Sequence, residues 1–254
     1  MELDATVQRF ILIFFRTFSI LWLLPIFTSR AISIPFKAGL GLVLSYLALD
    51  FVWAPQYTSY DTHILFVLVI KEIFIGLAIS FVIRLLFMMI YAASELAAFQ
   101  TGFSFARFMD PLTMTQISVL EQFKNILAIM VFFSMDCHHA IIKGIFLSFK
   151  ELPPGSVVLN SNLFNYLITA TGKIFSVGLK ISAPVTVTLF IVELSLGLLS
   201  RLIPQINVFI EGIPVKILIA MVVLSFSLGI TVTAIAGIFG GIENELTKVI
   251  RLLV

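Results

Sequence analysis

The chain has 254 residues, of which 60% are hydrophobic and 12% are charged, and its formal net charge at pH 7 is +2. A typical soluble domain is about 45–50% apolar and about 25% charged, so this composition excludes an ordinary water-soluble globule. The small net charge argues against nucleic-acid binding by charge alone. A single cysteine, Cys137, excludes an intrachain disulfide and a multi-cysteine metal site.

The first residues, Met1 to Asp4, are acidic where a cleavable signal would be basic, so the first apolar segment is expected to be retained. Further apolar segments follow along the chain, and no stretch alternates as a strand does. We expect helices at residues 10–27, 38–53, 64–98, 117–135, 163–199 and 217–242.

The third and fifth segments are too long for one crossing of about 20 residues, so each is expected to be a bent helix or a helical hairpin. Pro184 is expected to kink the fifth. Connections are expected at Pro55, at Asp110-Pro111, at Pro153-Pro154-Gly155, and from Pro204 through Gly212 to Pro214. The predicted fold class is an all-α, multi-pass membrane-type protein with a single domain over residues 1–254.

Charged residues recur inside these apolar segments. Each Lys, Arg or Asp at the centre of a membrane helix costs about 2.5–3.5 kcal/mol on insertion scales. We therefore expect many of these helices to face protein or an aqueous path, while snorkelling near helix ends is the alternative for any single residue. The residues concerned are Arg16, Lys71, Glu72, Arg84, Glu95, Glu121, Lys124, Lys173, Lys180 and Glu193.

Two patterns on helix faces predict contacts. Lys173 and Lys180 are seven residues apart on one face without an acid between them, so they need acids from another helix, or water. Small residues recur every four positions in the last apolar segment, and such a ridge predicts close packing against another backbone. These small residues are Gly229, Thr233, Gly237 and Gly241.

The sequence Asp136-Cys137-His138-His139 resembles a metal site at first sight. Adjacent residues on a helix point about 100° apart and so are not expected to converge on one ion. The only other histidine is His63. We expect instead a polar turn in which Asp136 caps a helix over residues 140–149 and the two histidines lie at a membrane interface or a subunit contact.

Catalysis has no support, because no Walker loop, GxSxG or HExxH motif is present. Residues 95–111 are unusual, with four Phe and one Met around Gly, Ser and Ala before Asp110-Pro111. Such a loop could close a pore by dewetting, although composition alone favours a helix end packed in a core. Residues 197–214 suggest irregular backbone inside protein or along a cavity, or an ordinary interhelical loop.

Four patches of sequence together resemble the FliR family of flagellar export-apparatus proteins, whose relatives in virulence secretion form the SpaR/YscT group. The first patch comprises residues 16–25, Ser29, Arg30, Pro35, Lys37 and Gly39. The second comprises Glu72, Gly76, Glu95, Gln100, residues 102–106, Asp110 and Pro111. The third comprises Asp136, His138, His139, Ser148, Phe149 and residues 152–155. The fourth comprises residues 197–199, Arg201, Pro204, Gln205, Asn207, Phe209, Gly212 and Pro214.

The resemblance covers nearly the whole chain and implies bent helical hairpins within a hetero-oligomeric assembly in the bacterial inner membrane, at the flagellar basal body. It implies FliP-like and FliQ-like subunits as partners, with FlhB-like and FlhA-like components nearby, and an entrance channel for unfolded export substrates. Membrane lipid is a further expected contact. No catalytic, cofactor or metal site is implied.

The resemblance also implies roles for particular residues. The plug that closes the gate maps onto Phe103, Ser104, Phe105, Phe108, Met109, Asp110 and Pro111. Subunit contact or channel lining is assigned to Glu95, Gln100, Lys173, Lys180, Glu193, Arg201, Pro204, Gln205 and Asn207.

Two departures from the family pattern bear on the branch. Flagellar members commonly have Gly where Cys137 stands and often have Asn where Ser200 stands. The Asp-x-His-His turn favours the flagellar branch, while Ser200 leaves the injectisome branch open. A small-solute secondary transporter is a less favoured alternative, because no inverted repeat is visible.

Overall fold

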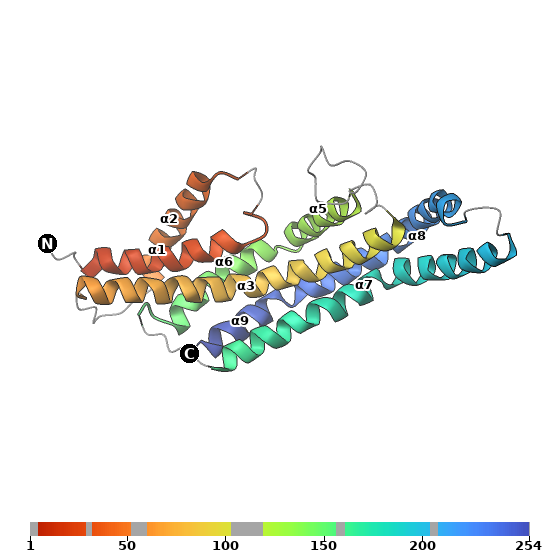
Figure 1. Ribbon diagram of the computed structural model, residues 1–254. Coiled ribbons are helices and arrows are strands. Elements are labelled where there is room, and N and C mark those ends of the chain that lie inside the picture. Colours follow the sequence, from red (N-terminus) through yellow and green to blue (C-terminus); the bar gives the residue numbers. More distant parts are fainter. Residues whose placement is uncertain are drawn as a thin grey trace. The chain divides into compact units, whose positions relative to one another are not determined.

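The computed structural model describes residues 5–28, 32–51, 60–102, 119–155, 161–203 and 208–253. Every regular element within these ranges is a helix (Figure 1), so the all-α prediction is confirmed. The helices are α1 (Ala5–Leu23), α2 (Ile34–Phe51), α3 (Thr62–Thr101), α5 (Val119–Ser134), α6 (Cys137–Glu151), α7 (Ser161–Leu202), α8 (Val208–Gly240) and α9 (Ile242–Leu252).

Several of these helices are long and apolar enough to cross a membrane, which confirms the membrane-type class. By length and composition, four spans qualify within the described residues, or five if α5 and α6 together form one broken span. The four are Ala5–Leu23, Thr62–Thr101, Asn162–Leu202 and Gly212–Leu252.

The two longest predicted segments are continuous helices, so the hairpin alternative for each is wrong. Helix α3 runs for 40 residues and α7 for 42. A helical hairpin needs a loop of 2–5 residues, and neither segment contains a cluster of breakers that would form one. Pro184 lies inside α7 and leaves the carbonyl of Lys180 without its usual backbone donor.

The connection predicted through Gly212 and Pro214 is also corrected, because α8 already begins at Val208 and contains both residues. Gly212 serves close packing here: a Cβ at this position would lie 2.6 Å from Cδ1 of Leu196 on α7. A single sequence does not distinguish a glycine that allows two helices to pack closely from a glycine that ends a helix.

Helix α9 was not predicted, because its average composition is too polar for an apolar segment. Its buried residues follow a helical spacing, and charged side chains occupy the opposite face. The buried residues are Ile242, Leu246, Val249 and Ile250. Helix α9 packs on α6, where Gly144 leaves room for Leu246.

The packing divides the chain into two compact units, which we describe separately. Unit 1 comprises Met1–Leu86, Asp136–Thr171 and Gly240–Val254. Unit 2 comprises Phe87–Met135 and Gly172–Phe239.

Each unit has its own apolar core. In unit 1, α1 packs on α2, and Leu12, Leu65 and Leu68 form a buried cluster. In unit 2, the rings of Phe87, Phe132 and Phe239 lie within 5.6 Å of one another between centroids. A second cluster in unit 2 comprises Ala97, Ala98, Leu120, Val185, Leu189 and Ala220.

Candidate functional site

Part of the predicted site falls outside the described residues. This holds for the whole plug, namely Phe103, Ser104, Phe105, Phe108, Met109, Asp110 and Pro111, and for Pro204, Gln205 and Asn207. These assignments stay predictions. The remaining predicted residues lie on α3, α7 and α8, except Gly241, which caps α9.

In unit 1, two of the charges predicted to need partners satisfy each other at a buried junction that we call the Arg16–Glu72 joint. The Arg16 guanidinium on α1 donates from Nε to Oε2 of Glu72 on α3 at 2.5 Å, and both side chains are fully buried. Their 56-residue separation hid this pairing from the sequence. For this pair, the protein that surrounds the buried charges belongs to the chain itself.

The Arg16–Glu72 joint also holds the end of α6. Arg16 Nη1 donates to the carbonyl oxygens of Ser148 at 3.0 Å and Leu152 at 2.8 Å, which are acceptors at the helix terminus. The backbone N–H of Gly155 donates to Oε1 of Glu72 at 2.8 Å. One ion pair thus ties together α1, α3, α6 and the turn at residues 153–155.

Close packing of α1 on α3 brings this ion pair together. A Cβ at Gly76 would lie 1.9 Å from Oγ of Ser19 and 2.5 Å from the backbone oxygen of Arg16. The backbone oxygen cannot move aside as a side chain can, so this position of α3 tolerates only glycine at the observed separation. The guanidinium of Arg16 also lies 4.6 Å from the ring centroid of Phe149.

In unit 2, three helices meet in a smaller polar group that we call the Glu193 cluster. Gln100 on α3 donates from Nε2 to Oε2 of Glu193 on α7 at 3.1 Å. Lys216 on α8 pairs with the other carboxylate oxygen. The Glu193 side chain stays 43% exposed and the Lys216 side chain 17% exposed. The sequence analysis did not identify Lys216 as a site residue, because Pro214 suggested a loop at this point.

The Glu193 cluster lies near the end of α3, which finishes at Thr101 and is followed by Gly102 with φ 82°. Glycine at a positive φ is a common helix stop. Farther from the cluster, in the first half of α7, Gly178 packs closely on α3, because a Cβ there would lie 3.2 Å from the backbone nitrogen of Ala93. Polar contacts of the Glu193 cluster therefore join α3, α7 and α8, and Gly178 separately brings α7 close to α3.

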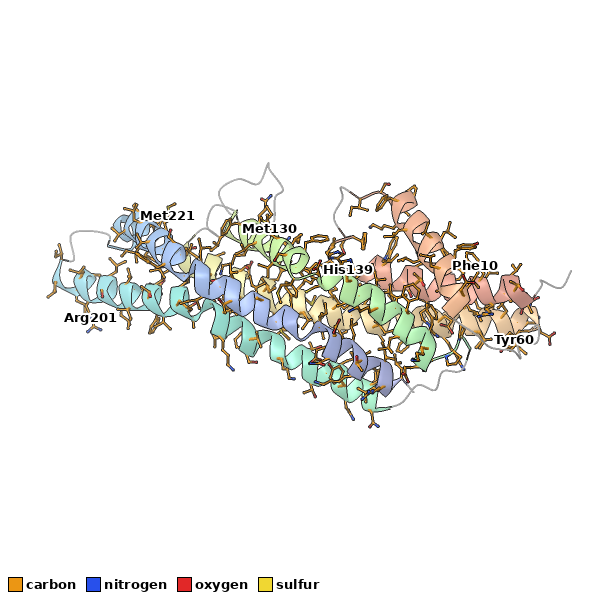
Figure 2. All side chains as sticks on the ribbon, turned by 180° about the vertical axis from the view of Figure 1, so that it is seen from behind. Phe10, Tyr60, Met130, His139, Arg201 and Met221 are labelled. Atoms are coloured by element: carbon orange, nitrogen blue, oxygen red, sulfur yellow. The ribbon has the colours of Figure 1, made fainter. Side chains whose placement is uncertain are left out.

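The remaining charged site residues are exposed. Glu95 lies on the exposed side of α3. Lys173, Lys180 and Arg201 lie on the exposed side of α7, and Figure 2 labels Arg201 near the end of that helix. Among the described residues, the side-chain ammonium groups of Lys173 and Lys180 have no hydrogen-bond or ion-pair partner.

An exposed face of α7 connects these cations. Val187 and Leu194 follow Lys173 and Lys180 at seven-residue intervals, and Arg201 continues the series. Val187 is 57% exposed and Leu194 is 55% exposed. Residues seven apart share one helix face, so we name these five residues the α7 face.

The small residues of α8 lie on an exposed side of that helix. No other described side chain or neighbouring backbone comes within 4 Å of a Cβ built at Gly229 or Gly237. Thr233 is exposed and donates to the backbone oxygen of Gly229 at 2.9 Å, while Gly241 is half-buried beside α9. Close packing on this ridge stays a prediction.

The turn at Asp136 differs from its predicted form. Asp136 occupies the cap position of α6, but its side chain makes no capping hydrogen bond and its backbone is left-handed, with φ 55°. The expectation that adjacent side chains diverge is wrong here, because one donor atom from each of Asp136, His138 and His139 lies within 4.8 Å of the others. Figure 2 labels His139 on this turn.

Comparison with known proteins identifies the family. Residues 7–242 match the family described as "Bacterial export proteins, family 1". The flagellar biosynthetic protein FliR of Pectobacterium carotovorum subsp. carotovorum is 33% identical over 226 residues, which cover 87% of this chain and 85% of the relative.

Two further relatives are also flagellar biosynthetic proteins FliR. FliR of Aquifex aeolicus (strain VF5) is 33% identical over 229 residues, covering 88% of this chain and 86% of the relative. FliR of Bacillus subtilis (strain 168) is 28% identical over 233 residues, covering 91% of this chain and 90% of the relative. A family match over residues 7–242, joined to an all-helical membrane-type fold, means that the chain belongs to the FliR family of bacterial export proteins.

Proposed function

We propose that this chain is a subunit of the flagellar type III protein-export gate in the bacterial inner membrane, at the flagellar basal body. With FliP-like and FliQ-like subunits it forms the entrance channel for unfolded export substrates. FlhB-like and FlhA-like components contact this assembly. The family match over residues 7–242 carries this proposal.

The surface of α7 supports a protein partner. Only 17% of the most apolar part of Asn162–Leu202 is buried within the chain, against 67% for Thr62–Thr101. An apolar helix with so little cover needs lipid or another protein around it. Lys173 and Lys180 on the α7 face make lipid costly, at about 2.5–3.5 kcal/mol each near a bilayer centre. A neighbouring subunit with acidic groups would satisfy both the apolar and the charged parts of this face.

The same assembly gives the phenylalanine-rich segment a role. Residues 103–111 form the plug of the closed channel, with Phe103, Phe105, Phe108 and Met109 as its apolar constriction. The segment begins directly after Gly102, where α3 stops. The bond between Gln100 and Glu193 holds this end of α3 against α7. The chain itself catalyses no reaction in this mechanism.

Co-purification from native membranes tests the assembly. The tagged chain is extracted in mild detergent, and mass spectrometry identifies what accompanies it. Recovery of FliP-like and FliQ-like proteins in a stable large complex is the expected result, and the identity of the partners separates the flagellar from the injectisome branch. Recovery of the chain alone as a stable monomer or homo-oligomer would refute the gate and favour a small-solute transporter.

Ion leakage tests the plug separately. Removal of residues 105–110 should leave co-purification unchanged and make the membrane permeable to ions, because the apolar constriction is lost. A matched control removes the same number of residues from the connection at 156–160 and its neighbour Ser161. Normal ion tightness in an assembled 105–110 deletion would show that these residues do not close the channel.

A further inference from the structure

The turn between α5 and α6 brings together one carboxylate and two imidazoles, all within unit 1. Oδ1 of Asp136 lies 3.5 Å from Nδ1 of His139 and 4.0 Å from Nε2 of His138. The two imidazole ring centroids are 4.1 Å apart, and the ring planes differ by 37°. A single carboxylate oxygen therefore faces both rings.

The backbone explains this convergence. Asp136 adopts the left-handed conformation, which Asp tolerates better than most residues, and its carbonyl accepts the N–H of His139 at 2.9 Å. This tight turn folds the side chain of Asp136 back over the first turn of α6. The carboxylate is not used to cap the helix. A non-glycine residue at a positive φ has a conformational cost, and such positions concentrate at functional sites.

The contacts of Asp136 with the two imidazoles are longer-range ion-pair contacts and not short hydrogen bonds. The distances of 3.5 Å and 4.0 Å between the Asp136 oxygen and the histidine nitrogens are longer than the usual N–H···O range of 2.7–3.2 Å. One ligand atom from each of the three side chains lies within 4.8 Å of the others. A metal ion could fit between the carboxylate oxygen and the two imidazole nitrogens at this spacing.

We propose that Asp136, His138 and His139 bind a divalent transition-metal ion such as Zn²⁺. Imidazole and carboxylate are ligands that Zn²⁺ takes at about 2.0–2.2 Å, which places neighbouring ligands of a tetrahedral shell roughly 3.3 Å apart. The donor atoms here lie within 4.8 Å, so small side-chain rotations bring them into range. Their exposed fractions of 72%, 36% and 62% leave room for such rotations.

The remaining coordination position is open to water or to a donor from another chain. Three protein ligands with one open position are typical of zinc sites that exchange a ligand. Cys137 does not belong to the donor set, because its side chain is buried at 3% exposure among the packed helices. The metal would close the turn by linking the cap residue Asp136 to half-buried His138 and exposed His139 in the first turn of α6.

Direct metal binding tests this site. The gate complex is purified with a tag that contains no histidine, stripped with a chelator, and titrated with ZnCl₂ while bound zinc is measured by mass spectrometry. The expected result is a single zinc bound per copy of this chain. Replacement of Zn²⁺ by Co²⁺ should add visible absorption bands that report nitrogen and oxygen ligands.

Variants locate the ligands. His139→Gln and Asp136→Asn should each weaken zinc binding at least tenfold, and Asn keeps the left-handed backbone accessible, so Asp136→Asn tests the carboxylate without forcing the turn to change. His63→Gln is the matched control, because His63 is an exposed histidine outside the turn and its loss should leave the affinity unchanged.

Three outcomes would overturn the proposal. They are no zinc bound by the wild-type complex, equal affinity in assembled Asp136→Asn and His139→Gln complexes, or an equal loss of affinity in His63→Gln. Recovery of the complex at wild-type yield shows that a loss of zinc does not result from a loss of assembly.

Discussion

The Arg16–Glu72 joint and the Glu193 cluster are two solutions to the same problem of placing charge among apolar helices. In the joint, both charged side chains are fully buried, and backbone groups from the end of α6 and from Gly155 add hydrogen bonds to the ion pair, while Nη2 of Arg16 has no partner among the described residues. In the Glu193 cluster, the Glu193 side chain stays 43% exposed, and among the described residues its carboxylate is bonded by side chains alone.

The contrast separates charges that stabilise the fold from charges that remain available for contact with another subunit. Removing one partner of a buried pair leaves an uncompensated charge and costs about 3–5 kcal/mol, whereas a half-exposed pair contributes about 0–1 kcal/mol. The cations of the α7 face contribute no ion-pair energy within the chain, because no described residue pairs with them. We therefore propose that the joint stabilises the fold and that the α7 face serves assembly.

Loss of the buried arginine should have the largest effect. Arg16→Met leaves Glu72 buried without a partner and should destabilise the chain by about 3–5 kcal/mol. The loss of stability is measured as the amount of chain in the membrane and as the thermal midpoint of the purified complex. The double variant Arg16→Met with Glu72→Met should recover part of the loss, and Lys71→Met is the control for charge removal at a partly exposed neighbour. Wild-type levels of Arg16→Met would contradict a structural role for the joint.

A methyl group at the close approach of α1 and α3 should have the next largest effect. Gly76→Ala places a carbon 2.5 Å from the backbone oxygen of Arg16 and should cost about 1–3 kcal/mol by overpacking. The thermal midpoint of the complex measures the change. Gly39→Ala is the matched control, because nothing lies within 4 Å of a Cβ at Gly39 and alanine favours the helix. An equal midpoint for the two variants would mean that α1 and α3 are not this close.

Charge reversal on the α7 face should spare the chain and weaken the assembly. Lys173→Glu or Lys180→Glu places an acid where the proposed partner offers acids, so severalfold less of the partner subunits should co-purify. Lys150→Glu is the control, since Lys150 is an exposed lysine elsewhere, on α6. Unchanged recovery of partners with both α7 variants would show that neither lysine forms an essential contact.

The smallest effect is expected at the half-exposed cluster. Glu193→Gln keeps the shape and the bond to Gln100 but loses the charge pair with Lys216, and should change stability by no more than about 1 kcal/mol. A double-variant cycle with Lys216→Met isolates the pair. A coupling as large as that of the Arg16–Glu72 pair would remove the distinction between the two regions.

Local properties of the chain were predictable from sequence. Composition and apolar periodicity indicate helices of membrane type, and the predicted segments at residues 64–98 and 163–199 lie within α3 and α7. The spacing of Ile242, Leu246, Val249 and Ile250 would also have revealed α9, if amphipathic segments had been sought as well as apolar ones.

Tertiary properties were not predictable. The partner of Arg16 is 56 residues away, and the joint depends on the absence of a side chain at Gly76, which no periodicity indicates. The convergence of Asp136, His138 and His139 depends on one left-handed backbone conformation that helical geometry would exclude. Whether Gly212 and Pro214 interrupt a helix or lie within it is decided by packing against α7, beyond local propensity.

The most direct test of the assembly is photo-crosslinking from the α7 face in native membranes. A photo-reactive phenylalanine analogue is placed at Val187 and, separately, at Leu194, both exposed between the cations of this face. We predict crosslinks to a FliP-like or FliQ-like subunit at both positions, and none when the chain is produced without the other gate subunits. Adducts to lipid alone, in membranes where the complete gate is assembled, would contradict the account.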